Sequence, residues 1–328
     1  MSAPAVTDWH AHWIPPEALA LLAGRTTPPC LIHDGAARRL RLPDGRAPAV
    51  KEAQLDLDAR RVALDQAGID RQVLSLAVIA GIFPAALPAE IERAVAEATN
   101  RGFARLARES GGRFGGLALL PTADPDRAAR LLEIAVEEQG LEGGMLPADA
   151  FADDSTAERF RPVLAAAHRL RTQLFIHPGP ICGHPWPGGG DDPLALLRRR
   201  AVGFQDSLTA AAITLDYTGL LDPYPEARVR LANLAGTLPL LVERIALTAE
   251  RMGLPPSRAD GRPRHILADT ASFGAASLTL AARTLGADRL VFGSDCPALT
   301  LPPARAAVAE AAFTAAEGDA LLRGDALA

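Results

Sequence analysis

Short apolar segments alternate with longer helical segments along most of the chain, and this alternation limits the possible folds more than any other feature. Runs such as residues 117–120 are apolar at every position, as expected for strands that are buried on both faces. The predicted strands cover residues 5–12, 71–78, 114–120, 141–146, 172–177, 228–233, 265–270 and 289–292. The pattern predicts an α/β protein, a (β/α)8 TIM barrel of parallel strands.

The segments between these strands have the composition and spacing of helices. Predicted helices cover residues 17–23, 57–67, 89–109, 125–139, 155–170, 193–221 (as two helices), 238–252, 275–285 and 303–317. An open, doubly wound sheet is the alternative for such a pattern. No Gly-x-Gly-x-x-Gly motif follows the first strand, so the sequence does not support a dinucleotide site. We expect residues 1–328 to form one barrel domain.

Residues 26–50 interrupt the pattern after the first strand. They are irregular and rich in Pro, Gly and Arg, and they predict a hairpin around Pro43, Asp44 and Gly45. Long insertions of this kind are often functional. We therefore expect a small insertion that forms a flap over one end of the barrel.

The composition excludes several classes of partner. The net charge of -5 argues against a nucleic-acid-binding surface. The three cysteines lack metal-type spacing, and no disulfide framework is expected, which fits a reducing cytoplasm. Residues 1–7 lack the features of a signal peptide, and the most apolar window, residues 73–87, is too short for a spanning helix. These features predict a cytoplasmic protein that binds neither nucleic acid nor a membrane.

Polar residues fall where the predicted strands end. His10 and His12 are two residues apart on the first strand, so both side chains project to the same face. Active sites of (β/α)8 barrels lie at the C-terminal ends of the strands. The residues found there are His10, His12, His177, Asn233, Asp269 and Asp295. Imidazoles with a carboxylate suit Zn²⁺, with Mn²⁺ or Fe²⁺ as alternatives.

Several motifs resemble those of a known family. They are Asp8-x-His10-x-His12 followed by Pro15, residues 68–75 (GIDRQVLS), residues 175–178 (FIHP), residues 234–239 (LAGTLP) before Arg244, and residues 292–297 (FGSDCP). Together they resemble the amidohydrolase superfamily, and within it the amidohydrolase 2 group of aminocarboxymuconate-semialdehyde decarboxylase and its relatives. The resemblance runs from about Asp8 to the final helix. The motifs are specific for the group but not for a substrate.

The resemblance implies non-oxidative decarboxylation of a small unsaturated or aromatic carboxylic acid. By the same resemblance, the metal ligands are His10, His12, His177 and Asp295. Arg244 matches an arginine that reaches the site of a neighbouring subunit and binds the substrate carboxylate, which implies a homodimer. We expect Asp295 also to shuttle a proton, provided that its pKa is raised near the site.

One position departs from the group. Strand six usually ends there in a histidine that activates the metal-bound water, whereas this chain has Asn233. An amide cannot take a proton at neutral pH, but Asn233 can ligate through its carbonyl oxygen or orient a water. His184, in the loop after strand five, is a candidate replacement base. The remaining alternative is a weakened metal site with altered or lost chemistry.

Other residues are candidates for supporting roles. Asp8 is expected to support the first metal-binding histidine as an outer carboxylate. Trp9, Trp13 and Trp186 are candidates for an aromatic wall around a planar substrate. Asp269 either lines the pocket or caps the following helix.

Two basic residues in or beside the insertion, Arg46 and Lys51, are candidates for binding a substrate carboxylate. The predicted partner is therefore a small carboxylic acid. A metal-dependent hydrolase of a lactone or amide is the alternative to the decarboxylase, and a barrel that has lost this chemistry is the third hypothesis.

Overall fold

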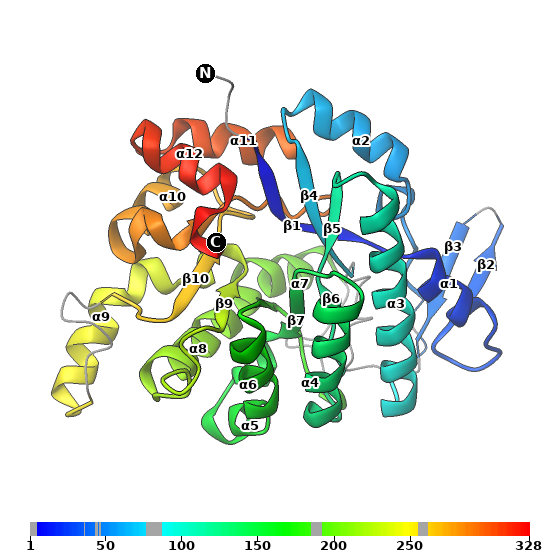
Figure 1. Cartoon of the computed structure of the whole chain (residues 1–328), viewed down its shortest axis with the longest axis horizontal. Coiled ribbons are helices and arrows are strands. Elements are labelled where there is room, and N and C mark those ends of the chain that lie inside the picture. The colour runs from blue at the N-terminus through cyan, green and yellow to red at the C-terminus, as the bar shows by residue number, and fades with distance from the viewer. Residues whose placement is uncertain are drawn as a thin grey trace.

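The computed structural model describes residues 5–35, 37–42, 45, 47–76, 87–184, 192–254 and 262–328. Parallel strands form two sheets, in the orders β1-β4-β5 and β11-β10-β9-β8-β7-β6. The strand bounds are β1 Thr7–Trp13, β4 Arg71–Leu76, β5 Phe114–Gly116, β6 Ala118–Leu119, β7 Gly143–Pro147, β8 Gln173–His177, β9 Arg228–Leu231, β10 Ile266–Asp269 and β11 Leu290–Val291. Figure 1 shows these strands inside a layer of helices, which confirms the α/β class.

The two sheets join along both edges. β5 pairs with β4 and β6 pairs with β7, so residues 114–119 pass from one sheet to the other. On the opposite side, the Trp9 N–H donates to the Phe292 carbonyl (2.9 Å) and the His12 N–H donates to the Cys296 carbonyl (2.7 Å). Backbone hydrogen bonds thus continue around the strands, as the predicted (β/α)8 barrel requires. The single strand predicted over 114–120 is wrong, because Leu117 separates two short strands.

Helices cover the outside of the strands, mostly where the sequence predicts them. Their bounds are α1 Pro16–Ala23, α2 Leu57–Gln66, α3 Ala89–Glu109, α4 Pro125–Glu133, α5 Asp154–Glu158, α6 Arg161–Leu170, α7 Pro193–Arg198, α8 Phe204–Tyr217, α9 Leu238–Arg251, α10 Ala275–Ala281, α11 Leu301–Glu310 and α12 Ala315–Arg323. No helix of the described residues is both long enough and apolar enough to cross a membrane.

Three helix predictions need correction. The helix predicted over 155–170 is divided into α5 and α6, because Pro162 occupies the first turn of a new helix. The final predicted helix is divided into α11 and α12, and a capping box of Thr314 and Glu317 begins α12. The two helices predicted over 193–221 are continuous, because a π-helical segment, Arg199–Gly203, joins α7 to α8.

The insertion after β1 contains antiparallel backbone pairing on both sides of the predicted turn, since Arg39 pairs with Ala49 and the Leu40 N–H donates to the Pro48 carbonyl (2.9 Å). It also contains a hairpin that the sequence does not predict. β2 (Cys30–Asp34) pairs antiparallel with β3 (Ala37–Arg41), and the hairpin lies beside α1 at the edge of the molecule (Figure 1). Gly35, with a φ of 59°, supplies the left-handed residue of the turn. The predicted turn residues Pro43 and Asp44 lie outside the described residues.

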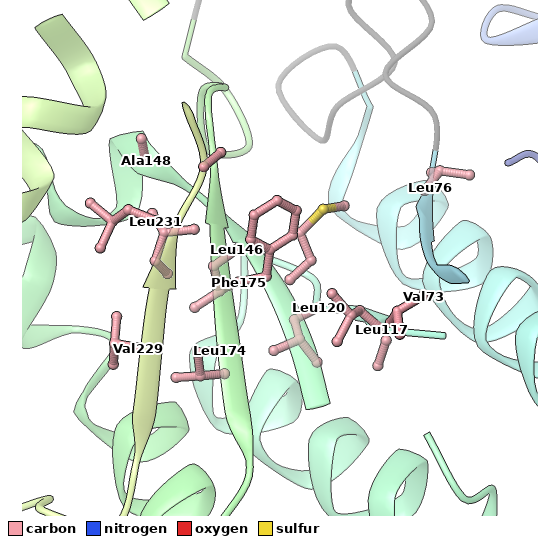
Figure 2. Packing of buried hydrophobic residues seen from close by; sticks show 14 of the residues in the cluster. Val73, Leu76, Leu117, Leu120, Leu146, Ala148, Leu174, Phe175, Val229 and Leu231 are labelled. Carbon is pink, nitrogen blue, oxygen red and sulfur yellow. The ribbon is translucent and has the colours of Figure 1, made fainter. Parts of the chain in front are cut away.

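The barrel wall is built from apolar side chains. Figure 2 shows Val73, Leu117, Leu146, Phe175 and Leu231 packed together from successive strands. All of them are almost fully buried, and truncating a buried Phe to Ala typically costs ~3–5 kcal/mol. Because this packing fixes the strands, the residues at their C-terminal ends are held in defined positions.

Candidate metal centre

Three histidines and one aspartate meet at the C-terminal ends of the strands. One ligand atom from each of His10, His12, His177 and Asp295 lies within 4.8 Å of the others. His10 Nε2 is 3.2 Å from His12 Nε2, and Asp295 Oδ1 is 3.1 Å from His12 Nε2 and 3.6 Å from His10 Nε2. Residues up to 285 positions apart in the sequence thus lie together, as the barrel topology predicts.

Local backbone structure brings Asp295 beside the histidines. Its N–H donates to the His10 carbonyl at 2.7 Å, which aligns the segment after β11 with β1. Gly293 allows this close approach, because a Cβ at that position would lie 2.7 Å from the Cβ of His10. Two features of the sequence together place the carboxylate within reach of two imidazoles. They are the glycine at position 293 and the two-residue spacing of His10 and His12 on β1.

Each imidazole is held from behind through its Nδ1 atom. His10 Nδ1 lies 3.0 Å from Asp269 Oδ2, His12 Nδ1 lies 2.9 Å from Ser75 Oγ, and His177 Nδ1 lies 3.0 Å from the Pro178 carbonyl. Carboxylate, hydroxyl and carbonyl oxygens accept a hydrogen bond from Nδ1–H, which leaves the Nε2 lone pair directed inward. This arrangement fits a bound divalent cation, because three Nε2 atoms and a carboxylate oxygen are a common donor set.

Two of the three imidazoles and the carboxylate have the charge state that a cation site needs. The third imidazole, His10, differs: burial would lower its pKa, but Asp269 and Asp295 raise it. Burial lowers the pKa of His12 and holds the pKa of His177 well below its usual range, so both rings are neutral at neutral pH. Burial alone would raise the pKa of Asp295, but the hydrogen bond with His12 and the charge of His10 lower it to about 2. The expected raised pKa of Asp295 is therefore wrong, and this residue is an anion.

Asp269 lies behind His10 and not on the wall of a pocket. It is fully buried, and its Oδ2 accepts from Arg230 Nη1 (2.8 Å) as well as contacting His10. Its Oδ1 accepts the backbone N–H groups of Asn233 and Ala271. The prediction of a substrate contact is contradicted by this burial. The alternative role as a cap of the following helix is also wrong, because the N-cap residue of α10 is Gly274 and the Ala271 bond lies in the turn before it.

Arg230 is part of the site although it is not among the residues predicted from the sequence. The side chain is fully buried, donates to the Trp9 carbonyl (3.0 Å) and lies 4.0 Å over the Phe175 ring. Burial lowers its pKa to about 10, so it remains a cation beside Asp269. The available signal was an arginine placed between the apolar residues Val229 and Leu231 in the interior of a strand.

Asp8 stabilises backbone and does not contact an imidazole, so its predicted role is wrong. Its carboxylate accepts from Ser294 Oγ (2.6 Å), Gln72 Nε2 (2.7 Å) and the N–H groups of His10 and Ser294. These bonds join β1 to β4 and to the segment that carries Asp295. Asp269, more than 250 residues away in sequence, has the role that Asp8 was expected to have.

Asn233 begins a left-handed turn directly after β9. Asn233, Leu234 and Ala235 have φ values of 52°, 55° and 57°. Asn tolerates this conformation better than most residues, and strained backbone of this kind persists mainly where the surroundings enforce it. Among the described residues, no hydrogen-bond partner is found for the buried Oδ1 of Asn233. A buried acceptor without a partner is costly, which is consistent with a role toward a ligand.

Other predicted residues lie away from the four-residue cluster. His184 is half-exposed, and its Nδ1 contacts Asp149 Oδ2 at 2.7 Å. Lys51 and Arg244 are exposed, the latter on α9. Arg46 and Trp186 lie outside the described residues, so the structure does not place them.

The expected aromatic wall is wrong for the two tryptophans of β1. Trp13 is almost fully buried, donates from Nε1 to the Leu55 carbonyl and packs near Phe103. Trp9 packs against Gly324 in the C-terminal segment. Odd-numbered residues of β1 project opposite to His10 and His12, because side chains alternate along a strand.

Comparisons with known proteins agree with this geometry. A sequence model of the amidohydrolase (Amidohydro_2) family matches residues 7–328. Gamma-resorcylate decarboxylase of Rhodococcus jostii (strain RHA1) is 27% identical over 268 residues, which cover 73% of this chain and 77% of that protein. Gamma-resorcylate decarboxylase of Polaromonas sp. (strain JS666 / ATCC BAA-500) is 27% identical over 274 residues, with coverages of 78% and 82%.

Solved structures share the fold. 5-Carboxyvanillate decarboxylase LigW from Sphingomonas paucimobilis superposes with a TM-score of 0.75 at 19% identity, over 99% of this chain and 98% of that one. Dihydroxybenzoic acid decarboxylase from Polaromonas sp. JS666, with bound manganese and 2-nitroresorcinol, gives a TM-score of 0.71 at 21% identity, over 98% and 96%. Since the family match spans nearly the whole chain, the protein belongs to the amidohydrolase family, in the amidohydrolase 2 group.

Proposed function

We propose that this protein is a metal-dependent, non-oxidative decarboxylase of a hydroxylated aromatic carboxylic acid. The observation that carries the proposal is the cluster of His10, His12, His177 and Asp295, whose imidazole Nδ1 atoms are all held from outside. Curated relatives named as gamma-resorcylate decarboxylases support the reaction and the substrate class.

These four residues would hold one divalent cation. The donor set is compatible with Zn²⁺, and the manganese in a structural neighbour makes Mn²⁺ an equal candidate. When bound, the cation supplies Lewis acidity that favours the anionic form of a substrate oxygen. The chain itself supplies the remaining chemistry.

Asp295 would move the proton. As a carboxylate, it takes the proton of the substrate hydroxyl next to the carboxylate group as the substrate binds. It then returns that proton to the ring carbon that carries the carboxylate. The bond between this carbon and the carboxylate breaks, its electron pair returns to the ring and CO₂ leaves. The phenolate oxygen finally regains a proton from solvent, so one proton is consumed for each CO₂ formed.

A substrate panel tests the proposal. Metal-loaded protein is expected to release CO₂ from 2,6-dihydroxybenzoate or a related ortho-hydroxybenzoate, and to leave benzoate, which has no hydroxyl to donate the proton, unchanged. CO₂ release separates this reaction from the hydrolysis of a lactone or amide. Turnover of lactones without CO₂ release from any acid would refute the decarboxylase proposal.

Arg244 is proposed to complete the site of a second subunit. It lies on α9 among exposed apolar side chains, since Leu240 is 71%, Leu247 64% and Met252 69% exposed. Exposed apolar side chains on one helix often mark an interface between subunits. An arginine on this outward surface is suited to bind the carboxylate of a substrate held by a partner copy.

Mixing two inactive variants is expected to restore activity if Arg244 acts across a dimer. Arg244→Ala and Asp295→Asn homodimers each lack one group, whereas a mixed dimer has one site with both. Random reassociation should then yield about a quarter of wild-type activity, because half of the dimers are mixed and half of their sites are complete. Arg251→Ala, also exposed on α9, is the control for Arg244→Ala. If mixed dimers are shown to form but activity is not recovered, Arg244 does not act across the dimer. It then acts within its own subunit or has no role in the reaction.

Asn233→His tests whether the amide has its own role. We expect turnover to fall roughly 5- to 100-fold, because an imidazole does not reproduce the amide oxygen and the loss of such a polar contact costs ~1–3 kcal/mol. The larger ring also lowers stability in this buried, left-handed position. Steady-state kinetics at saturating Mn²⁺, with circular dichroism to verify folding, measure the effect. A large gain of turnover would instead mean that the reaction uses a base at position 233, which histidine supplies and asparagine does not.

A further inference from the structure

Ser272 contacts the Asp295 oxygen that is not beside His12. It lies in the turn after β10, its side chain is exposed, and its Oγ donates to Asp295 Oδ2 at 3.3 Å. The other oxygen, Oδ1, is 3.1 Å from His12 Nε2. The two carboxylate oxygens therefore face different surroundings, one the buried imidazoles and the other an exposed hydroxyl.

The turn that carries Ser272 is fixed to the segment that carries Asp295. The hydroxyl of Thr270 donates to the Gly293 carbonyl (3.3 Å) and accepts from the Gly293 N–H (3.1 Å). The Thr270 N–H also donates to the Val291 carbonyl (3.1 Å). Because backbone and side-chain bonds hold the two segments together, the approach of Ser272 to Asp295 is a property of the fold and not of one flexible side chain.

The backbone of Ser272 is in a conformation that favours glycine. Its φ is 70°, and the facing Asp295 has a φ of 58°. Residues with a Cβ are disfavoured in this region and persist there mainly where the surroundings enforce it, often at functional sites. Glycine would relieve the strain, but it would also remove the only side-chain group that Ser272 offers to Asp295. This combination points to a use for the hydroxyl.

We infer that Ser272 is a positioning residue, which holds the Asp295 carboxylate with Oδ1 toward His12 and Oδ2 toward the Ser272 hydroxyl. This orientation assigns Oδ1 to the cation site and leaves Oδ2 to the substrate. The inference rests on the proposed decarboxylase function for its chemistry, but the orientation itself is a structural statement about two side chains.

Two substitutions separate the hydroxyl from the backbone strain. Ser272→Ala keeps a Cβ in the left-handed conformation and removes the donor, whereas Ser272→Gly removes both the donor and the strain. We expect kcat to fall about tenfold or more in both variants, since a hydrogen bond to a charged group is lost, with KM and Mn²⁺ affinity changed by less than about threefold. If Ser272 had only a structural role, the kcat of Ser272→Gly would equal that of the wild type.

Arg171→Gly is the matched control. Arg171 is exposed at the end of α6 and has a φ of 50°, so glycine relieves a similar strain far from Asp295 in the fold. We expect Arg171→Gly and Ser272→Gly to keep the thermal stability of the wild type, and Arg171→Gly alone to keep its kcat. A kcat within about twofold of wild type in both Ser272 variants would overturn the inference.

A crystal structure of metal-free Ser272→Ala gives a readout that does not depend on turnover. We expect the Asp295 carboxylate to rotate or to divide between two rotamers. A single, unchanged rotamer would overturn the positioning role. If the wild type decarboxylates none of the acids, the proposed function fails, and this structure still decides the role of Ser272.

Discussion

Protein purified without added metal or chelator is expected to contain about one zinc or manganese ion per chain, and His177→Ala is expected to bind that ion at least ~100-fold more weakly. The structural reason is that His177 offers one of the four converging ligand atoms. Zinc sites of four ligands are worth roughly 10–16 kcal/mol in peptides, so an average ligand contributes ~3 kcal/mol. Elemental analysis and calorimetric titration with Mn²⁺ measure the loss.

His184→Ala is the control for that experiment. His184 lies in the same loop region after β8, but its ring is half-exposed and contacts Asp149 instead of the cluster. We expect this variant to keep wild-type metal content. If the wild type contained no metal and took none up on reconstitution, the cluster would not be a metal centre, and the hypothesis of altered or lost chemistry, which Asn233 motivates, would take its place.

The fold and the four-residue cluster could be predicted because both depend on short-range patterns. Strand and helix alternation is readable from apolar runs, and His10 and His12 share a face by the two-residue repeat of a strand. Strand ends meet in any parallel barrel, so His177 and Asp295 are expected near this pair, as are Asn233 and Asp269. The resemblance to the amidohydrolase 2 group pointed to the four residues of the cluster.

The supporting residues could not be predicted because their roles depend on packing between distant strands. Nothing near Asp269 in the sequence indicates that its carboxylate would contact His10, 259 residues away. The same holds for Arg230, which is stabilised in the interior by Asp269 and Phe175. Local sequence instead suggested Asp8, which is close to His10 along the chain but directed at backbone.

Some element boundaries could not be predicted because one residue decides them. The composition of Pro43, Asp44 and Gly45 predicts a turn, and Arg39 pairs antiparallel with Ala49 on either side of it, whereas the turn at Gly35 between β2 and β3 is additional. A helix over 155–170 would contain Pro162 in its interior, but this residue lies in the first turn of α6 and begins a new helix. Such choices depend on which of two local signals the tertiary packing favours.

Asp295→Asn is expected to lower kcat by ~10²–10⁴-fold, the usual contribution of general acid–base catalysis. The amide keeps the shape of the side chain and can still offer a carbonyl oxygen to a cation, but it cannot carry a proton. Since Asp295 is an anion whose pKa is lowered to about 2, the substitution also removes a negative charge from among the three imidazoles. We therefore expect weaker metal binding as well, and kcat has to be measured at saturating Mn²⁺.

The comparison of metal content with turnover distinguishes the two roles of Asp295. Full turnover loss with restored metal occupancy would support proton transfer by this residue, because the cation site is then complete. Recovery of turnover at high Mn²⁺ would mean that Asp295 acts only as a metal ligand and that another group transfers the proton. Asp149→Asn, in which the carboxylate beside His184 is replaced, should stay within about twofold of wild type. An Asp295→Asn protein with wild-type metal content and wild-type kcat would contradict the mechanism outright, since no other carboxylate among the described residues belongs to the cluster.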